Sequence, residues 1–341
     1  MKAFVTEKYG KRSPLVLKDV PDPLLREDDV LVQIRAAGVN VLDAKIRDGE
    51  FKLLLPYKTP LILGNDVAGV VTRVGPRVSR FRVGDEVYAR PDKDRIGTFA
   101  ELIALNQNDV ALKPKNLDMT EAASVPLVAL TAWQALVEIG KVGRGDKVFI
   151  QAGSGGVGTV AIQLAKHLGA SVATTASQGS FEMLGTLGAD VLIDYKTQEF
   201  DRQLHGYDFV LHSQGTPELE KSLQVLKPGG RLVSVSGPPD PAFARQIGLP
   251  LPVRGVISLR SRRVRGLARR RGVEYSFLFM RAEGEQLSRI TTLIEQGVLR
   301  PIVEKVYPFT ETPKALAHVE SGRAKGKVVV RVSEEGPGKN G

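Results

Sequence analysis

The stretch Lys147–Lys166, KVFIQAGSGGVGTVAIQLAK, constrains the fold more than any other part of the chain. Its apolar run Val148–Ile150 predicts a buried strand, and the apolar positions that follow Val157 predict a helix lying on a sheet. Between them Gly153, Gly155 and Gly158 have the spacing G-x-G-x-x-G. In a dinucleotide site these glycines permit a tight turn, a close approach of the backbone to the pyrophosphate, and close helix–strand packing.

The stretch therefore predicts a dinucleotide site in which the helix N-terminus faces the pyrophosphate. The predicted contacts are Gly153, Ser154, Gly155, Gly156, Val157 and Gly158. A glycine-rich turn that binds no ligand is the alternative.

Length and composition indicate a globular protein of two domains. The chain has 341 residues, of which 42% are hydrophobic and 25% charged. No apolar run approaches the roughly 20 residues that span a bilayer, and the start MKAFVTEKYG lacks a signal-peptide apolar region. We therefore expect a cytoplasmic protein with no membrane partner. The absence of cysteine excludes disulfides, thiolate zinc sites and a cysteine nucleophile.

The pattern along the chain predicts two kinds of domain. Short strands such as Val30–Ala36 and Gly69–Val74, separated by Gly, Pro and Asp turns, predict a β-rich barrel or sandwich over residues 1–121. Within Phe81–Val87, the segment Val83–Val87 is expected to be a turn that leads into a further strand. From Lys147 strands and helices alternate, which predicts an α/β domain with a parallel, doubly wound sheet over residues 122–299. A turn at Lys227–Gly230 is expected to precede the fifth strand, Arg231–Ser236, and the sixth strand is expected at Val273–Arg281. Residues 300–341 are expected to complete the first domain through a strand at Lys327–Val332.

The end of the second strand of the α/β domain indicates which dinucleotide binds. NAD-specific folds have an acidic residue about 20 positions past the glycines, but this strand ends in Thr174-Thr175-Ala176-Ser177. A carboxylate would repel a 2′-phosphate whereas hydroxyl groups would not, so we predict NADPH as the cofactor. Ser177 and Ser180 are the candidate phosphate ligands, with Tyr195 and Lys196 nearby. Capping of the expected helix 181–187 by these serines is a compatible alternative.

Further motifs extend over nearly the whole chain: Ala37–Asp43 (AGVNVLD), Leu63–Val70 (LGNDVAGV), Val83–Val87 (VGDEV), Leu130–Trp133 (LTAW), Leu187–Asp190 (LGAD), Lys227–Arg231 (KPGGR) and Gly326–Val329 (GKVV). With the glycine-rich stretch they resemble the zinc-free medium-chain dehydrogenase/reductases, in the quinone oxidoreductase and enone (alkenal) reductase group. The resemblance implies a GroES-like barrel domain, built from both ends of the chain, with a Rossmann domain inserted.

The same resemblance argues against a zinc site. Zinc-dependent members have a metal-binding Cys where this chain has Asn40, and Gly-His-Glu where it has Gly64-Asn65-Asp66. The four histidines, His167, His205, His212 and His318, match no ligand spacing. Without a Lewis acid, we expect hydride transfer to an acceptor that is already polarised, such as a quinone or an α,β-unsaturated carbonyl.

The candidate catalytic residues come from the barrel domain. The resemblance places Asn40 near the nicotinamide, Lys45 could donate a hydrogen bond to the developing enolate, and Tyr57 could donate a proton or line the pocket. A turn-holding role for Asn40, a solvated Lys45 and a packing role for Tyr57 are the alternatives. Phe51 and Leu53–Leu55 are expected to form either a substrate wall or part of the core.

By the same resemblance, further cofactor contacts are expected from Thr131, Ser236, Gly237 and the backbone around Phe277 and Phe279. The loop Ser213-Gln214-Gly215 also belongs to this set. The resemblance further implies a homodimer whose sheet continues through the sixth strand of each copy.

An arginine-rich segment is the most unusual feature. Pro241–Val273 contains nine arginines and no lysine or acidic residue, and Val253–Ala268 within it has the spacing of an amphipathic helix. A solvated helix face, attraction of NADPH and acidic substrates, and RNA binding are the three alternatives. No aromatic residue is interleaved before Tyr275, so base stacking has no obvious platform and we do not favour nucleic acid as a partner. A protein that binds NADPH without turnover is a further alternative to the enzyme.

Overall fold

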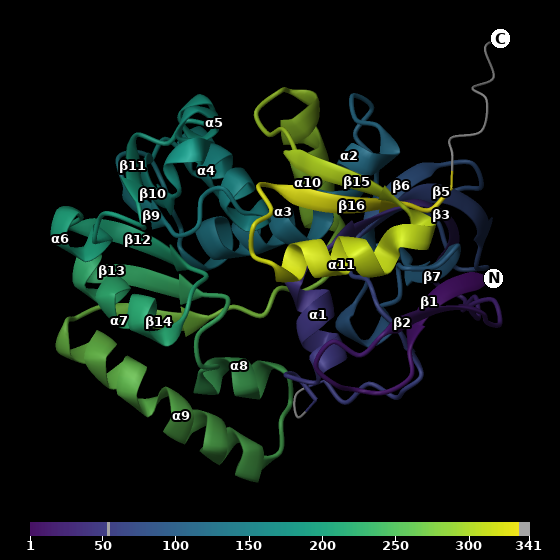
Figure 1. Cartoon of the computed structure of the whole chain (residues 1–341), viewed down its shortest axis with the longest axis horizontal. Helices are drawn as coiled ribbons and strands as arrows, with labels where there is room; N and C mark the ends of the chain where they lie inside the picture. The colour runs from purple at the N-terminus through teal and green to yellow at the C-terminus, as the bar shows by residue number, and fades with distance from the viewer. Residues whose placement is uncertain (53–54, 334–341) are drawn as a thin grey trace. The chain divides into compact units, whose positions relative to one another are not determined.

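The computed structural model of the chain describes residues 1–52 and 55–333 (Figure 1). The chain forms two compact units. Unit 1 contains Met1–Leu130 and the residues from Arg281 onward, and unit 2 contains Thr131–Met280. Unit 2 is therefore shorter at both ends than the expected 122–299, since helix α10 (Gly284–Glu295) packs against β8 (Val110–Leu112) of unit 1.

Unit 1 is built on two sheets, of three and seven strands. The smaller has the order β2-β1-β4, and the larger has the order β15-β16-β3-β5-β6-β8 with β7 also paired to β3. The other strands are β1 (Lys2–Thr6), β2 (Leu15–Asp19), β3 (Asp29–Val39), β4 (Leu61–Ile62), β5 (Val67–Val74), β6 (Glu86–Ala89), β7 (Leu102–Asn106), β15 (Val303–Pro308) and β16 (Lys327–Arg331). In β16 Val328 lies opposite Val39 of β3, so the C-terminal strand pairs with a strand from the N-terminal part of the chain.

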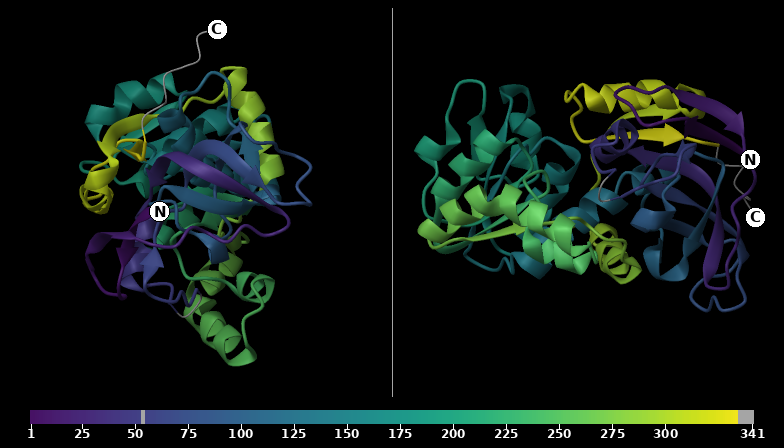
Figure 2. Two further views of the ribbon diagram at one scale, coloured as in Figure 1. Left: turned by 90° about the vertical axis from the view of Figure 1, so that its right-hand side faces the viewer. Right: turned by 90° about the horizontal axis from the view of Figure 1, so that it is seen from below.

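Several short helices of unit 1 pack against these sheets. They include α1 (Val41–Asp48), α2 (Met119–Ala123) and α11 (Thr312–Glu320), while α3 (Pro126–Trp133) begins in unit 1. Figure 2 shows α11, in yellow, lying along β15 and β16. Its buried face, with Leu316 and Val319, joins Val328 and Val330 in one core cluster, which ties the C-terminal elements to the barrel.

Unit 2 contains the predicted doubly wound sheet. Six strands run parallel in the order β11-β10-β9-β12-β13-β14. They are β9 (Lys147–Ile150), β10 (Ser171–Ala176), β11 (Val191–Asp194), β12 (Tyr207–His212), β13 (Leu226–Ser234) and β14 (Glu274–Phe277). The strand order reverses between β9 and β12, and ligands of such sheets bind at the carboxyl ends of the strands beside that reversal.

The helices of unit 2 follow the predicted alternation. They are a π-helix at Gln134–Ile139, then α4 (Gly156–His167), α5 (Phe181–Thr186), α6 (Phe200–Gln203), α7 (Thr216–Val225), α8 (Pro241–Gln246) and α9 (Leu251–Arg270). The apolar core joins Phe149, Val210 and Leu232 of the sheet to Leu223 of α7 and Val264 of α9.

The predicted turn within Val83–Val87 leads into β6, which begins at Glu86, because Gly84 adopts a left-handed conformation with φ of 93° and turns the chain. Two other expected boundaries were wrong for local reasons. The expected turn at Lys227–Gly230 is part of β13, as an irregularity in its pairing with β12. The sixth strand is confined to Glu274–Phe277.

Candidate functional site

The glycine-rich turn connects β9 to α4. Ala152 carries the left-handed conformation of the turn, with φ of 53°, so Gly153 does not serve the turn in the way we predicted. A Cβ at Gly153 would lie 2.2 Å from Thr174 Oγ1, and a Cβ at Gly158 would lie 2.4 Å from the carbonyl oxygen of Ala152. Close packing therefore explains both glycines. A Cβ at Gly155 would have only that carbonyl within contact distance, at 3.3 Å.

The first turn of α4 is open to a ligand. Gly155 is its N-cap and provides no side-chain cap, so no side chain of this residue occupies the first amides of the helix. Ser154, Gly156 and Val157 are half-buried rather than sealed in the core. Free amides and the positive end of the helix dipole suit a pyrophosphate.

The two predicted phosphate ligands lie in the segment that follows β10. Neither Ser177 nor Ser180 makes a side-chain hydrogen bond that caps the following helical turns, so the capping alternative is wrong. Ser180 Oγ is buried without a hydrogen-bond partner. Buried hydroxyls are rarely left unpartnered, so a ligand that bonds this atom would satisfy it.

The two threonines before these serines serve the fold. Thr174 Oγ1 donates to the carbonyl of Ile150 at 2.6 Å, and Thr175 Oγ1 accepts from the amide of Ala152 at 3.1 Å. Tyr195 and Lys196 follow β11 and are both exposed. The residues at this corner therefore provide hydroxyls and a cation and fit a phosphorylated ribose.

A buried histidine joins the ends of β12 and β13. His212 Nδ1 lies 2.8 Å from Ser234 Oγ, and its Nε2 lies 3.1 Å from the carbonyl of Gly215. Ser236 Oγ donates to the carbonyl of Gln214 at 2.6 Å, and the amide of Gly237 donates to Ser234 Oγ at 2.7 Å. The hydroxyl of Ser236, expected to contact cofactor, is thus bonded within the loops.

The segment after β14 is held by aromatic packing. The rings of Phe277 and Phe279 lie 5.0 and 5.9 Å from that of Phe243 in α8. The amide of Phe277 donates to Asp240 Oδ2 at 2.9 Å, so this amide, one of the expected backbone contacts, already has a partner. Thr131, another expected contact, is buried in α3.

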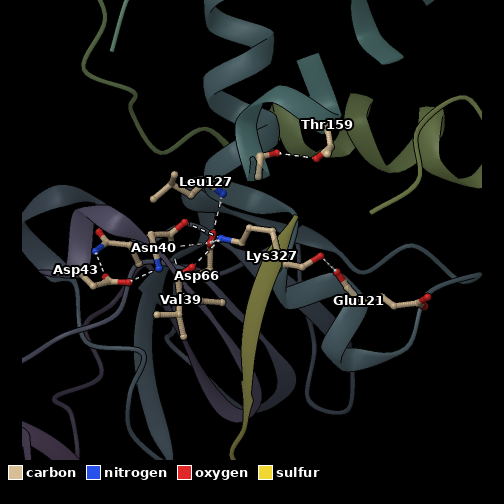
Figure 3. A network of polar contacts seen from close by, with 12 residues as sticks. Val39, Asn40, Asp43, Asp66, Glu121, Leu127, Thr159 and Lys327 are labelled. Carbon is tan, nitrogen blue, oxygen red and sulfur yellow. Dashed lines mark hydrogen bonds and ion pairs between the residues drawn. The ribbon is translucent and has the colours of Figure 1, made fainter. Parts of the chain in front are cut away.

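Unit 1 contains a buried network of polar side chains around Asn40 (Figure 3). Lys327 Nζ donates to Asn40 Oδ1 at 2.6 Å and to Asp66 Oδ2 at 3.0 Å. Asn40 Nδ2 donates to the same Asp66 oxygen at 2.9 Å. The backbone amide of Asn40 donates to Asp43 Oδ2 at 2.7 Å, and Asn65 Nδ2 donates to Asp43 Oδ1 at 2.7 Å.

This network holds Asn40 firmly at the N-terminus of α1. Asn40 is the N-cap and Asp43 closes a capping box on its amide. Asp66 also anchors the start of α3, because its Oδ1 accepts from the amide of Leu127 at 2.7 Å. Both heteroatoms of the Asn40 side chain have protein partners, which favours a positioning role over direct contact with substrate.

Burial dominates the electrostatics of the network. It raises the pKa of the Asp43 carboxyl to about 7, and the nearby Asp66 carboxylate adds to that rise, while hydrogen bonds from Asn65 and Asn40 oppose it. Burial likewise raises the pKa of Asp66, against the lowering effect of the Lys327 ammonium. The Lys327 ammonium is thus the group that favours the ionised form of Asp66 against the effect of burial.

Lys45 and Tyr57 are placed differently from Asn40. Lys45 lies in the last turn of α1, with 38% of its side chain exposed, and Lys45 Nζ lies 3.5 Å from Glu50 Oε2. Tyr57 donates its hydroxyl to the carbonyl of Lys93 at 2.6 Å and packs beside Phe51 against the core of unit 1. Burial raises the pKa of Tyr57. Of the expected wall Leu53–Leu55, only Leu55 belongs to the described residues, and it is buried.

Lys327 is the residue that sequence reasoning missed. The motif Gly326–Val329 was used only for its resemblance, although a lysine that begins an otherwise apolar strand is a signal of a buried cation. Lys327 is 287 residues from Asn40 in sequence, so no local pattern connects the two.

The positions that hold zinc in zinc-dependent relatives do not fit zinc here. Asn40 bonds Lys327 and Asp66, and Asn65 bonds Asp43 through its amide nitrogen. A metal ion at this point would face the Lys327 ammonium and would have amides in place of thiolate and imidazole. Within residues 1–52 and 55–333, no group of three or more His, Cys, Asp or Glu side chains is arranged to hold a metal ion.

Comparison with known proteins matches both halves of the chain. The family described as "Zinc-binding dehydrogenase" matches residues 187–330, and that described as "Alcohol dehydrogenase GroES-like domain" matches residues 26–115, which confirms the predicted GroES-like fold. A mitochondrial NAD(P)H oxidoreductase of Danio rerio is 34% identical over 98% of this chain and 92% of its own length. A chloroplastic NADPH-dependent alkenal/one oxidoreductase of Arabidopsis thaliana is 34% identical over 97% of this chain and 79% of its own.

A solved structure agrees with these relatives. The quinone oxidoreductase from Coxiella burnetii superposes with a TM-score of 0.86 at 30% identity, covering 98% of this chain and 99% of its own. Among the described residues, no helix has both the length and the apolar character that crossing a bilayer requires.

Proposed function

Since the chain belongs to the zinc-free medium-chain dehydrogenase/reductases, in the group of quinone and alkenal oxidoreductases, we propose that it reduces α,β-unsaturated carbonyls with NADPH. The reaction would reduce the activated double bond of these compounds. Quinones would be the second class of acceptor. The chain is an oxidoreductase; its acceptor and its site residues are what we propose. The relatives named for alkenal/one and quinone reduction support these acceptors.

The observation that carries the proposal is the Lys327 ammonium, bonded to Asn40 and Asp66 where zinc relatives bind metal. Alcohol oxidation in those relatives depends on a Lewis acid that stabilises an alkoxide. The amide and ammonium groups found here cannot supply one. An enone or quinone is already polarised, so its reduction needs only orientation and a hydrogen-bond donor.

The residues of unit 2 fit NADPH. The open first turn of α4 would bind the pyrophosphate, and Ser177 with the unpartnered hydroxyl of Ser180 would bind the 2′-phosphate. Exposed Lys196 adds a positive charge beside them. NADPH, when bound, would supply the hydride that the β-carbon of the acceptor takes up, and a proton from water would then reach the α-carbon to give the saturated carbonyl.

We assign the donor role to Lys45. Negative charge develops on the carbonyl oxygen of the acceptor as it is reduced, and a cation that donates a hydrogen bond there lowers the barrier. Lys45 is half-exposed and its contact to Glu50 is long at 3.5 Å, so its ammonium is available to a ligand. The hydroxyl of Tyr57, in contrast, is bonded to the carbonyl of Lys93. Asn40 then acts as a positioning residue that fixes the start of the helix bearing Lys45.

Steady-state assays test the proposal. Oxidation of NADPH and of NADH would be followed with a short enone, with 1,4-benzoquinone and with the saturated ketone that corresponds to the enone. We expect turnover with the enone, weaker turnover with the quinone, and none with the saturated ketone. Preference for NADH, or turnover of the saturated ketone, would contradict the proposal.

Assembly and location stay predictions. We expect a homodimer that forms through β14, the strand at the edge of the sheet. The edge that β14 offers for pairing is short, because the strand has only four residues and the amide of Phe277 already donates to Asp240. Light scattering after size exclusion would measure the mass. We expect a cytoplasmic location, although relatives are named as mitochondrial and chloroplastic.

A further inference from the structure

Helix α9 concentrates the positive charge of the chain. Nine arginines lie within Pro241–Val273 with no lysine or acidic residue, and they account for almost all of the formal net charge of +10. Most of that segment is α9, which is 20 residues and therefore about 30 Å long. Figure 1 shows it as the long green helix beside α7 and β14, against which it packs.

One face of α9 is used by the fold. Ile257, Ser261, Val264 and Ala268 recur at intervals of three or four residues and are buried. Val264 and Ala268 belong to the core cluster of unit 2. This face fixes the helix to the sheet, so the opposite face points outward.

The N-terminal half of the outward face is apolar. Leu251, Val256 and Leu259 are 77%, 54% and 69% exposed. A single exposed apolar side chain is ordinary on a protein surface. Three large ones on one helix form an apolar patch, which is more stable in an apolar environment than in water.

The C-terminal half of α9 is cationic. Some arginines of α9 are bonded within the unit: Arg263 pairs with Glu220, and Arg265 donates to the carbonyl of Ser258. Four others are exposed and have no hydrogen-bond or ion-pair partner within the described part of the chain: Arg260, Arg262, Arg269 and Arg270. The same holds for Arg271, the C-cap of the helix. Their charge is uncompensated and suits an array of anions.

We propose that α9 docks the protein on the surface of an anionic lipid bilayer. A helix that lies in the interface buries apolar side chains at the headgroup boundary while basic side chains bind the lipid phosphates. The apolar side chains that would be buried at the headgroup boundary are Leu251, Val256 and Leu259. The unpaired arginines would bind the lipid phosphates. The three apolar residues are what favour lipid over nucleic acid, because nucleic acid gives exposed aliphatic side chains no burial and α9 has no aromatic side chain to stack on bases.

This proposal departs from our expectation that no membrane partner exists. That expectation rested on the lack of a segment that spans a bilayer, and a helix that lies on the surface does not need to span it. The residues of the docking surface are not those proposed to bind NADPH. The docking proposal therefore does not depend on the proposed reaction.

Vesicle binding tests the proposal. The full chain would be sedimented with vesicles of phosphatidylcholine alone and of phosphatidylcholine mixed with phosphatidylserine. We expect binding only to the anionic vesicles, weakened by salt. The triple variant Arg262→Gln, Arg269→Gln and Arg270→Gln should weaken binding by about a hundredfold, at roughly fivefold for each arginine. Leu259→Gln should weaken it by about tenfold with the charge unchanged.

A matched variant controls for net charge. Arg144, Arg289 and Arg323 are exposed arginines outside α9, and changing all three to Gln removes the same charge. We expect this variant to bind vesicles like the parent. An equal loss in both triple variants would overturn the proposal, as would binding to a single-stranded RNA without binding to anionic vesicles. Far-ultraviolet circular dichroism would verify that the variants are folded. If the triple variant of α9 is unfolded, vesicle binding by Leu259→Gln tests the proposal in its place.

A second copy of the chain is the remaining candidate to cover this face of α9. Light scattering on Leu259→Gln would detect it. A change of mass, with vesicle binding unaltered, would assign the face to a second copy of the chain and overturn the proposal. An unchanged mass with weakened vesicle binding would support it.

Discussion

Lys327 Nζ lies 3.0 Å from Asp66 Oδ2 in the interior of unit 1, and almost none of either side chain is exposed. Lys327 begins β16 and Asp66 immediately precedes β5, so residues far apart in sequence close the same network around Asn40. A buried ion pair of this kind is costly to break from one side, because the remaining charge is left without a counter-ion or solvent.

Lys327→Met should therefore destabilise unit 1. We expect the free energy of unfolding, measured in urea, to fall by about 3–5 kcal/mol, since Asp66 would be a buried carboxylate without its cation. Adding Asp66→Asn should recover part of the loss by removing that charge. Lys314→Met, which breaks a surface pair with Glu311, is the control and should have a small effect. A double variant less stable than Lys327→Met alone would refute this account.

His212 should make stability depend on pH. Burial lowers its pKa to about 4, whereas an unfolded chain has a value of about 6.5. As the pH falls below 6.5 the unfolded state takes up a proton that the folded state does not, so the free energy of unfolding decreases by roughly 3 kcal/mol in total down to pH 4.

Urea unfolding at several pH values between about 4 and about 7 measures this effect. In His212→Gln the contribution of this residue should disappear and the profile should flatten. The control is His205→Gln, because His205 is exposed. Parallel profiles for His212→Gln and the parent would show that the histidine is not responsible.

Ser177 should determine the choice of dinucleotide. Ser177→Asp places a carboxylate at the end of β10, where it would repel a 2′-phosphate and accept a hydrogen bond from a 2′-hydroxyl. We expect KM for NADPH to rise by about a hundredfold, in line with the loss of a charge-compatible contact, and KM for NADH to fall. Ser171→Asp, at the opposite end of β10, adds the same charge and should leave both values unchanged. Unaltered preference in Ser177→Asp would place the phosphate elsewhere.

Lys45 and Tyr57 should separate in their effects on turnover. Lys45→Met removes the proposed donor to the developing enolate, and we expect kcat to fall by about a hundredfold with KM for NADPH unchanged. Tyr57→Phe removes a hydroxyl that is bonded to Lys93, so we expect a modest loss of stability and little change in kcat. Lys58→Met, at an exposed position, controls for charge. A large loss of kcat in Tyr57→Phe alone would exchange the two roles.

Local patterns were sufficient for much of unit 2. Alternating strands and helices after Lys147 predicted the parallel sheet, and the spacing of Gly153, Gly155 and Gly158 predicted the turn into α4. These features depend on neighbours in sequence, which is why a pattern reveals them. The residue of that turn with a left-handed conformation is nevertheless Ala152. Glycine is required at position 153 because a side chain there would collide with Thr174, and not because of its backbone conformation.

Long-range contacts explain what the patterns did not reveal. Asn40 was predicted as a site residue, but its partner Lys327 comes from the other end of the chain and no periodicity points to it. The bond from Tyr57 to Lys93 joins two loops in the same way. The domain boundary near 299 shifted because α10 has an amphipathic pattern that suits either unit, and only packing against β8 decides between them.

The most direct test of the central claim follows the hydride into the product. The enzyme would be supplied with NADPH deuterated at C4 of the nicotinamide and with a short enone, and the product would be analysed by mass spectrometry and NMR. The account predicts a saturated ketone that carries one deuterium on the former β-carbon. An allylic alcohol with deuterium on the former carbonyl carbon, or a saturated ketone without label, would contradict it.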